Sequence, residues 1–326
     1  MSASEAATAG TPGTAVEIRV TDVARSFGDV HAVRSVSFEA HAGEVTGLVG
    51  PNGSGKTTLL LMLATLLSPD RGEIRIGGHD PVTESAAVRA QLGWMPDVLG
   101  AWPNLTVRRS LELTARLYDI SRSAAAARAN ELIALVDLEA LADQPTRVLS
   151  RGQKQRLSLA RALVHDPRVL LLDEPASGLD PGARIALRVL LRRLAAEGRT
   201  ILISSHVLSE LDELADRSVF LEAGVSVSAE RLAAARTTER GWRIRSLDSD
   251  TLPEALARAG VDAARVVRDP QGFVVPIAGD ERAAELLAQL VRAGVPVVSF
   301  SPAVGDLEHT FLDLSTHLSS DGKETR

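Results

Sequence analysis

One nine-residue stretch constrains the fold of this 326-residue chain more than any other: Gly50-Pro51-Asn52-Gly53-Ser54-Gly55-Lys56-Thr57-Thr58. It has the spacing Gly-x-x-x-x-Gly-Lys-Ser/Thr of a phosphate-binding loop. The apolar segment Val45–Val49 precedes it and predicts a buried strand, and residues 57–67 predict a helix. Loop N–H groups and the positive N-terminus of such a helix together bind phosphate oxygens. The stretch therefore predicts a nucleotide site, with Lys56 at the terminal phosphates and Thr57 as a ligand of Mg²⁺.

The choice of lysine supports this interpretation. Only three of the 36 basic residues are Lys, and the others are Arg. A compact ammonium fits between phosphates where a planar guanidinium does not. A chain that otherwise uses Arg almost everywhere nevertheless has Lys56 in the loop.

Composition excludes several classes of function. The net charge is −6 and no basic block is present, so we expect no nucleic-acid partner. The absence of cysteine excludes disulfides, thiolate metal sites and a cysteine nucleophile. No apolar run is long enough to cross a bilayer, so we expect no direct membrane insertion. Residues 1–14 and 319–326 have the composition of disordered tails.

Residues 15–225 predict one α/β domain. Apolar segments of strand length alternate with helical patterns, which is typical of a parallel or mixed sheet covered by helices. The clearest strands are Val45–Val49, residues 169–172 and Thr200–Ser204. Residues 97–148 are helical in pattern, with candidate helices at Val107–Leu117 and 124–136, and indicate a helical subdomain inserted into the α/β core.

A linker at 226–241 is expected to lead into a small α+β domain at 242–318. Its pattern predicts the order βαββαβ, the ferredoxin-like arrangement, with strands at 242–247, 264–268, 273–278 and 295–301 and helices at 252–259 and 281–293. Thr251 and Glu254 predict a capping box for the first of these helices. The second is expected to bury five side chains on one face: Ala283, Leu286, Leu287, Leu290 and Val291. A closing helix is expected to carry an apolar stripe of Leu307, Phe311, Leu314 and Leu318.

Acidic and polar groups follow the predicted strands of the first domain. Asp173 and Glu174 end an apolar strand, at the edge of an α/β sheet where ligands bind. Asp173 suits a Mg²⁺ ligand and Glu174 a general base for water. His206 follows the strand Thr200–Ser204 and is expected at the same edge, near the γ-phosphate. Ser150 and Gln153 predict a capping box that opens another helix.

These motifs resemble, in identity and order, those of the ATP-binding subunits of ABC transporters. The resemblance covers about residues 16–224 and includes the phosphate loop at 50–58, the signature at 149–153, the acidic strand end at 170–173 with Glu174, the loop at 177–180 and the switch His206. It implies that Phe27 stacks on adenine and that Glu174 and His206 are catalytic. It also implies that Ser150, Gly152 and Gln153 contact ATP held by the opposite subunit.

The same resemblance implies a P-loop ABC cassette with ATP and Mg²⁺ as cofactors. A chain with one phosphate loop and one signature needs a second copy or a paralogous cassette, and two ATP molecules would be sandwiched between them. A polytopic membrane permease would place the protein peripherally on the cytoplasmic face of the cell membrane. Two residues depart from the family pattern. Asp97 takes the place of the usual glutamine after a strand, and Arg151 that of the central signature glycine.

The C-terminal pattern is similar to that of ATPases that serve type-two ABC exporters for drugs, polysaccharides and lipids. Three hypotheses follow. The first is an exporter ATPase that powers a separate permease. The second is a soluble ABC ATPase, against which the single cassette and the absence of cysteine argue. The third is a non-hydrolysing ATP-dependent switch, which Asp97 leaves open and against which Glu174 and His206 argue.

Overall fold

The computed structural model describes residues 15–98, 100, 102–228, 231–232, 239–305, 307 and 309–311. The chain divides into two compact units, Met1–Ser226 and Val227–Arg326, each with its own core. The expected tails and most of the expected closing helix, including Leu314 and Leu318, lie outside the described residues.

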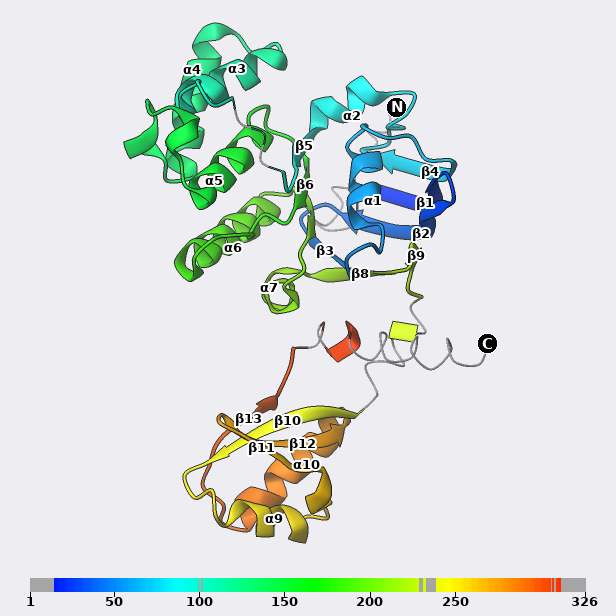
Figure 1. Ribbon diagram of the computed structural model, residues 1–326, viewed down its shortest axis with the longest axis vertical. Helices are drawn as coiled ribbons and strands as arrows, with labels where there is room; N and C mark the ends of the chain where they lie inside the picture. The colour runs from blue at the N-terminus through cyan, green and yellow to red at the C-terminus, as the bar shows by residue number, and fades with distance from the viewer. Residues whose placement is uncertain are drawn as a thin grey trace, which may run out of the picture. The chain divides into compact units, whose positions relative to one another are not determined.

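A mixed sheet forms the centre of the first unit, in the order β4-β1-β2-β9-β8-β3-β7-β6-β5 (Figure 1). The strands β5, β6, β7, β3 and β8 are parallel neighbours, whereas β1, β2 and β4 pair antiparallel. Their bounds are β1 (Val16–Phe27), β2 (Val30–His41), β3 (Val45–Val49), β4 (Arg71–Ile76), β5 (Leu92–Met95), β6 (Val169–Asp173), β7 (Thr200–Ser204), β8 (Arg217–Glu222) and β9 (Val225–Ser226). Strands β3, β6 and β7 are wholly buried, which explains why their sequences are apolar on both faces.

Helices of the first unit cover the sheet or form a separate group. They are α1 (Lys56–Leu63), α2 (Ser85–Gln91), α3 (Val107–Leu117), α4 (Arg122–Leu135), α5 (Arg151–Ala162), α6 (Pro181–Ala196) and α7 (Leu208–Leu214). Figure 1 shows α3, α4 and α5 gathered on the β5–β6 side, away from β1, β2 and β4. Helices α3 and α4 fall within residues 97–148, the region that the sequence predicts to be helical, whereas α5 follows that region.

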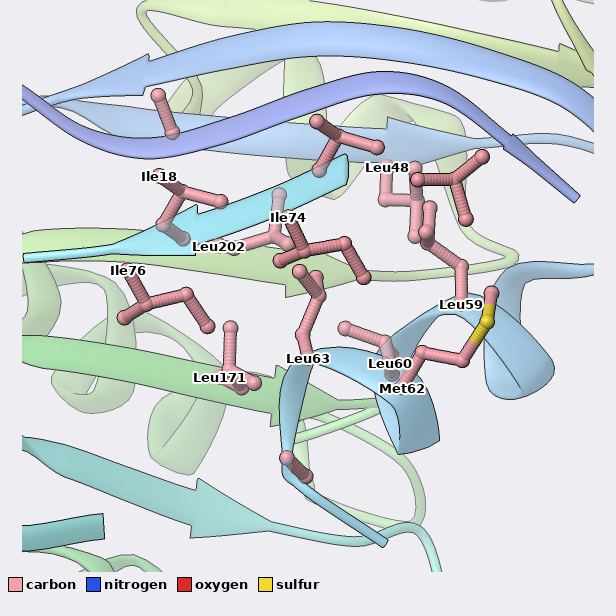
Figure 2. Close-up of a cluster of buried hydrophobic side chains, with 14 of the residues drawn as sticks. Ile18, Leu48, Leu59, Leu60, Met62, Leu63, Ile74, Ile76, Leu171 and Leu202 are labelled. Atoms are coloured by element: carbon pink, nitrogen blue, oxygen red, sulfur yellow. The ribbon is translucent and has the colours of Figure 1, made fainter. Parts of the chain in front are cut away.

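The core of the first unit is built around α1. Figure 2 shows its apolar side chains between β1 and β4 on one side and the parallel strands on the other. The fully buried set includes Ile18, Leu48, Leu59, Leu60, Met62, Leu63, Ile76, Leu171 and Leu202. Because α1 begins directly at the phosphate loop, this packing holds the loop at one edge of the sheet.

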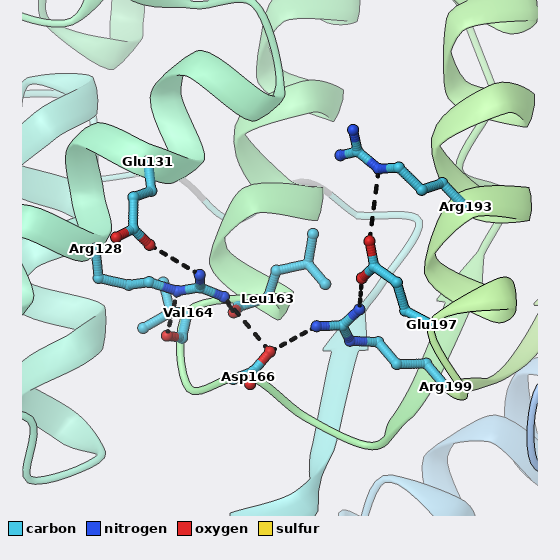
Figure 3. A network of polar contacts seen from close by, with 8 residues as sticks. All are labelled: Arg128, Glu131, Leu163, Val164, Asp166, Arg193, Glu197 and Arg199. Carbon is cyan, nitrogen blue, oxygen red and sulfur yellow. Dashed lines mark hydrogen bonds and ion pairs between the residues drawn. The ribbon is translucent and has the colours of Figure 1, made fainter.

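A network of charged groups joins the helical group to the sheet (Figure 3). Arg128 of α4 donates to the main-chain oxygens of Leu163 and Val164, 2.8 and 3.2 Å away, just after α5 ends. Asp166 lies 3.8 Å from the Arg128 guanidinium and accepts from Arg199, before β7, at 2.6 Å. The end of α5 is thereby attached both to α4 and to the main sheet.

The second unit contains a four-stranded antiparallel sheet in the order β11-β12-β10-β13, together with helices. Its elements are β10 (Glu239–Ser246), α9 (Leu252–Arg258), β11 (Val267–Asp269), β12 (Gly272–Ala278), α10 (Gly279–Arg292) and β13 (Val297–Pro302). This is the strand order of the split βαβ, ferredoxin-like arrangement. Trp242, Ile244, Phe273 and Val275 pack with Leu286 of α10 in its core.

Some local expectations were wrong. The helix predicted at 57–67 ends at Leu63, because Thr65 adopts a left-handed conformation with φ 62°. The Thr251–Glu254 capping box is absent: Thr251 has helical backbone angles, and Asp248 instead accepts from its N–H at 3.3 Å. Of the strand predicted at 264–268, only Val267 and Arg268 lie in β11, and residues 264 and 265 belong to a 3₁₀ turn, Ala263–Arg265. Val291 is exposed.

No helix in the described parts of the chain is both long and apolar enough to cross a membrane.

Candidate nucleotide site

The predicted site residues of the parallel strands lie along one sheet edge. Strands β3, β7, β6 and β5 are neighbours in that order. Their carboxyl ends lead, respectively, into the phosphate loop, His206, Glu174 and Asp97. Parallel strands bring their carboxyl ends to the same edge, which is where ligands of open α/β sheets bind.

The phosphate loop is closely packed against its surroundings. A Cβ on Gly50 would come within 2.5 Å of both the Leu221 oxygen and Ser54 Oγ. Gly55 has φ 98°, and a Cβ there would meet the Ala32 oxygen at 2.4 Å. Both positions therefore exclude a side chain, and Gly55 also needs a left-handed backbone.

Lys56 lies across the loop. Its ammonium donates to the oxygens of Gly50 and Pro51 at 2.7 and 3.1 Å, and the side chain is only 9% exposed. Burial lowers its pKa, and the negative charges of Glu174 and Asp173 act in the opposite direction. The positive charge is thus already placed inside the loop, next to the two acidic residues.

Asp173 is 5% exposed at the end of β6. Its Oδ1 accepts from Ser204 Oγ at 2.5 Å. Burial raises the pKa of Asp173, the hydrogen bond from Ser204 opposes that shift, Asp97 adds to it, and Lys56 again opposes it. Ser204 was not among the predicted site residues; its only sequence signal is its position at the end of a strand that enters the site.

Glu174 follows with an unusual backbone conformation, φ 52°. Its N–H lies 3.2 Å from the Ser204 oxygen and 3.1 Å from Ser204 Oγ. Its Oε2 lies 2.6 Å from His206 Nδ1, and the ring nitrogen donates because an ionised carboxylate only accepts. Glu174 and His206, predicted from separate motifs, therefore meet.

Gln155 of α5 also reaches this place. Its side-chain amide donates to the Glu174 main-chain oxygen at 2.9 Å, and the residue is 2% exposed. Sequence reasoning missed Gln155, because a glutamine in a charged, amphipathic helix looks like a surface residue.

The signature residues open α5. Ser150 and Gln153 form the predicted capping box: Ser150 Oγ accepts from the Gln153 N–H at 3.2 Å, and Gln153 Oε1 from the Ser150 N–H at 2.8 Å. A Cβ on Gly152 would lie 3.2 Å from Leu179, so the first turn of α5 packs closely on the loop at 177–180, after β6. Arg151 donates to Ser177 Oγ in that loop at 2.8 Å.

Phe27 ends β1, and its ring is 48% exposed with the Arg25 guanidinium 5.0 Å from its centre. It pairs with Val30, two residues before the Ala32 oxygen that packs on Gly55. The exposed ring therefore belongs to the hairpin that borders the phosphate loop. An aromatic face in this position is suited to stacking on a nucleotide base.

Asp97 is exposed just after β5. Met95 pairs with Leu172, so the residues after β5 run beside Asp173. The influence of Asp97 on the pKa of Asp173 agrees with that placement.

The residues present fit a nucleotide with a divalent cation. Ser54 Oγ is buried without a hydrogen-bond partner within the described structure, and the glycine-lined loop is of the type that surrounds phosphate. The Thr57 hydroxyl and the Asp173 carboxylate are hard oxygen donors of the kind Mg²⁺ prefers. Mg²⁺ is commonly bound by one or two carboxylates together with the substrate's phosphates, so these two protein ligands are sufficient.

Comparisons with known proteins agree with this site. Residues 33–177 match the ABC transporter family. The Nod factor export ATP-binding protein I of Burkholderia lata is 43% identical over 207 residues, which cover 64% of this chain and 68% of that protein. The daunorubicin resistance ATP-binding protein DrrA3 of Streptomyces coeruleorubidus is 33% identical over 312 residues, which cover 95% and 98%.

Solved structures give the same result. An ATP-binding subunit of an ABC transporter superposes with a TM-score of 0.61 at 28% identity, over 67% of this chain and 92% of that one. A dimeric cassette in a post-hydrolysis state with ADP and Pi gives a TM-score of 0.59 at 26% identity, over 65% and 97%.

The chain belongs to the family of ABC transporter ATP-binding subunits. The predicted cassette fold and the predicted ATP-binding, ATP-hydrolysing subunit are confirmed.

Proposed function

We propose that this chain dimerises around two Mg-ATP molecules and hydrolyses them to drive export through a separate membrane permease. The observation that carries the hydrolytic part is the 2.6 Å contact between His206 Nδ1 and Glu174 Oε2 at the phosphate-loop edge. A carboxylate held by a histidine beside a phosphate site has the chemistry of a general base for water.

Each group has a distinct task in this proposal. Lys56 leaves the oxygens of Gly50 and Pro51 and contacts the terminal phosphates. Thr57 and Asp173 would hold Mg²⁺, which would neutralise charge on the phosphates. Glu174 accepts the proton of the attacking water, and His206 orients Glu174 and contacts the γ-phosphate. Ser150, Gly152 and Gln153 bind the ATP carried by the opposite cassette.

The composition of the site supports the proposed dimer, because the chain has one phosphate loop and one signature. Ser150 and Gln153 hydrogen-bond to each other at the start of α5, and Ser150 is exposed there. The structural relative with ADP and Pi is itself dimeric. Two copies of this chain, or this chain and a paralogous cassette, would complete two sites.

A hollow of about 700 Å³ between α2, the residues after β5, α3 and α5 suits the permease. Leu117 and Val98 beside it are strongly exposed apolar side chains, and Arg89 and Arg161 line it. We assign it to a cytoplasmic helical segment of the permease with apolar and acidic side chains. Because the hollow adjoins Asp97, movement in the nucleotide site would reach the permease there.

The exporter assignment is supported by relatives named for Nod factor export and for daunorubicin resistance. The second of these aligns through the C-terminal unit as well. We therefore place the protein at the cytoplasmic face of the cell membrane, bound through its permease.

The test uses Glu174→Gln. The purified variant is expected to bind ATP, to form a stable ATP-dependent dimer and to lose most of its turnover. The same protein, used as bait with ATP on detergent-solubilised membranes of its host, is expected to retain a polytopic membrane protein, and Lys56→Ala is the control that should not. Turnover near the wild-type rate would refute Glu174 as the base, and recovery of soluble partners alone would refute the permease.

A further inference from the structure

Glu174 is held at its N–H, at its carboxylate and at its main-chain oxygen. Its N–H is bound by Ser204 at the end of β7, and its carboxylate by His206, two residues further on. Its main-chain oxygen accepts from the Gln155 amide at 2.9 Å and from the Ser177 N–H at 3.0 Å. The first two partners belong to the same strand end, whereas Gln155 belongs to α5, the helix that starts with the signature residues.

The conformation of Glu174 gives this third bond its importance. A residue other than glycine at φ 52° is in a sparsely populated region that persists only when the surroundings hold it. The Gln155 amide binds the carbonyl, whose direction would change if the backbone relaxed. Gln155 is 2% exposed, so its hydrogen bond is protected from water. Loss of the bond would leave the Glu174 oxygen with the Ser177 N–H as its remaining donor, which comes from the same loop and does not connect it to α5.

The helix α5 and the segment after β6 are joined at further points. Arg151 donates to Ser177 Oγ, and Gly152 lies against Leu179. Gln155 follows the N-cap Ser150 by five residues, about 7.5 Å along a helix axis. One short rigid stretch of helix therefore links the signature turn to the main chain of Glu174.

We propose that Gln155 is a positioning residue that makes the orientation of Glu174 depend on the position of α5. When ATP of the opposite cassette binds at the start of α5, the helix and the Glu174 carbonyl move together, so the base is aligned only when the neighbouring site is filled. This inference rests on the proposed function of Glu174 as the base.

The first test is steady-state hydrolysis by the full-length Gln155→Met protein. Met matches Gln in length but has no N–H to donate. We expect kcat to fall about 10- to 100-fold, with KM for ATP within about twofold, because the phosphate loop is untouched. Ser110→Ala is the control, a buried polar residue on the neighbouring helix α3, and should keep the wild-type kcat. An unchanged kcat in Gln155→Met, or an equal loss in Ser110→Ala, would overturn the proposal.

The second test is the pH dependence of kcat in Gln155→Glu. This variant tests the positioning role of Gln155 even if Gln155→Met does not fold. An ionised carboxylate cannot donate to the Glu174 oxygen, whereas a protonated one can. Burial raises the pKa of an introduced carboxyl, so protonation should increase as the pH falls from 8 to 6. The ratio of the variant's kcat to that of wild type should therefore rise as the pH falls from 8 to 6. A ratio that does not change with pH would refute the positioning role of Gln155.

The third test is a double-mutant cycle. If Gln155 acts through Glu174, Gln155→Met should change the residual turnover of Glu174→Gln by less than about twofold. Two losses that multiply would show that Gln155 acts elsewhere. If Glu174→Gln itself turns over normally, the proposed function fails; if it is inactive while Gln155→Met is normal, only this inference fails.

Discussion

The Arg151 guanidinium donates to Ser177 Oγ at 2.8 Å, and its side chain lies so close to Gly178 that a Cβ there would meet Arg151 Cδ at 2.6 Å. Arg151 replaces a glycine of the family pattern and stands at the N-terminus of α5, where a positive charge is unfavourable to the helix dipole. The contact with the loop after Glu174 gives this departure a structural role.

We expect Arg151→Gly to loosen the loop at 177–180. Loss of one charge-assisted hydrogen bond should raise hydrogen–deuterium exchange of its amides by about three- to tenfold. Mass spectrometry of the nucleotide-free protein measures this. Lys154→Ala is the control: it removes a charge from the same turn, and Lys154 has no hydrogen bond to this loop within the described structure. Equal exchange in Arg151→Gly and wild type would show that the contact does not order the loop.

Lys56→Ala and Lys56→Arg are both expected to weaken ATP binding by about 100-fold or more. Alanine removes the charge, and arginine keeps it on a planar group that does not fit between phosphates in the packed loop. Calorimetric titration measures the affinity, and ATP should no longer raise Tm. Normal binding by Lys56→Arg would mean that charge alone is required.

Asp97→Gln should retain or increase ATP hydrolysis. The loss of activity on the acid side of its pH profile should also move to lower pH. The negative charge of Asp97 contributes to the raised pKa of Asp173, and Asp173 must be ionised to hold a cation. Without Asp97, Asp173 stays ionised to a lower pH. The pH dependence of kcat/KM at fixed Mg²⁺ measures this, with Asp119→Asn as an acidic control elsewhere. A large fall in turnover would show that the Asp97 carboxylate has a role of its own.

His165 should make stability depend on pH. Its ring stacks on Tyr118 with centroids 3.8 Å apart, its Nε2 lies 3.1 Å from the Leu92 oxygen, and burial lowers its pKa. Below the ordinary histidine pKa of about 6.5 the unfolded chain binds the proton more readily than the folded one, so the free energy of unfolding falls as pH falls. Tm at pH 7.5 and 5.5 should differ less in His165→Gln than in wild type. Identical differences would contradict this.

The parts of the fold that local sequence determines were predictable. Val107–Leu117 has the predicted bounds because Thr106 caps it and its apolar spacing is that of a helix with one buried face. Ser150 and Gln153 form their capping box because both partners lie within one turn of chain. Asp173, Glu174 and His206 were placed together because parallel strands bring their ends to one edge.

The remainder depends on contacts that are distant in sequence. Gln155 and Ser204 acquire their roles only because α5 and β7 approach β6. Thr251 has the residue types of a capping box, yet Asp248 offers the N–H groups a competing acceptor. Val291 fits the helical spacing but falls at the edge of the buried stripe, where its side chain stays exposed among the described residues.

The position of the Lys56 ammonium has a consequence for ligand discrimination. In the resting loop two of its three N–H donors are already used by Gly50 and Pro51. A small anion such as inorganic phosphate or sulfate must compete with these bonds and brings little else in return. A nucleoside triphosphate adds further phosphates and a base that can stack on Phe27. The loop is thus protected against the abundant simple anions of the cell by the same lysine that its intended ligand requires.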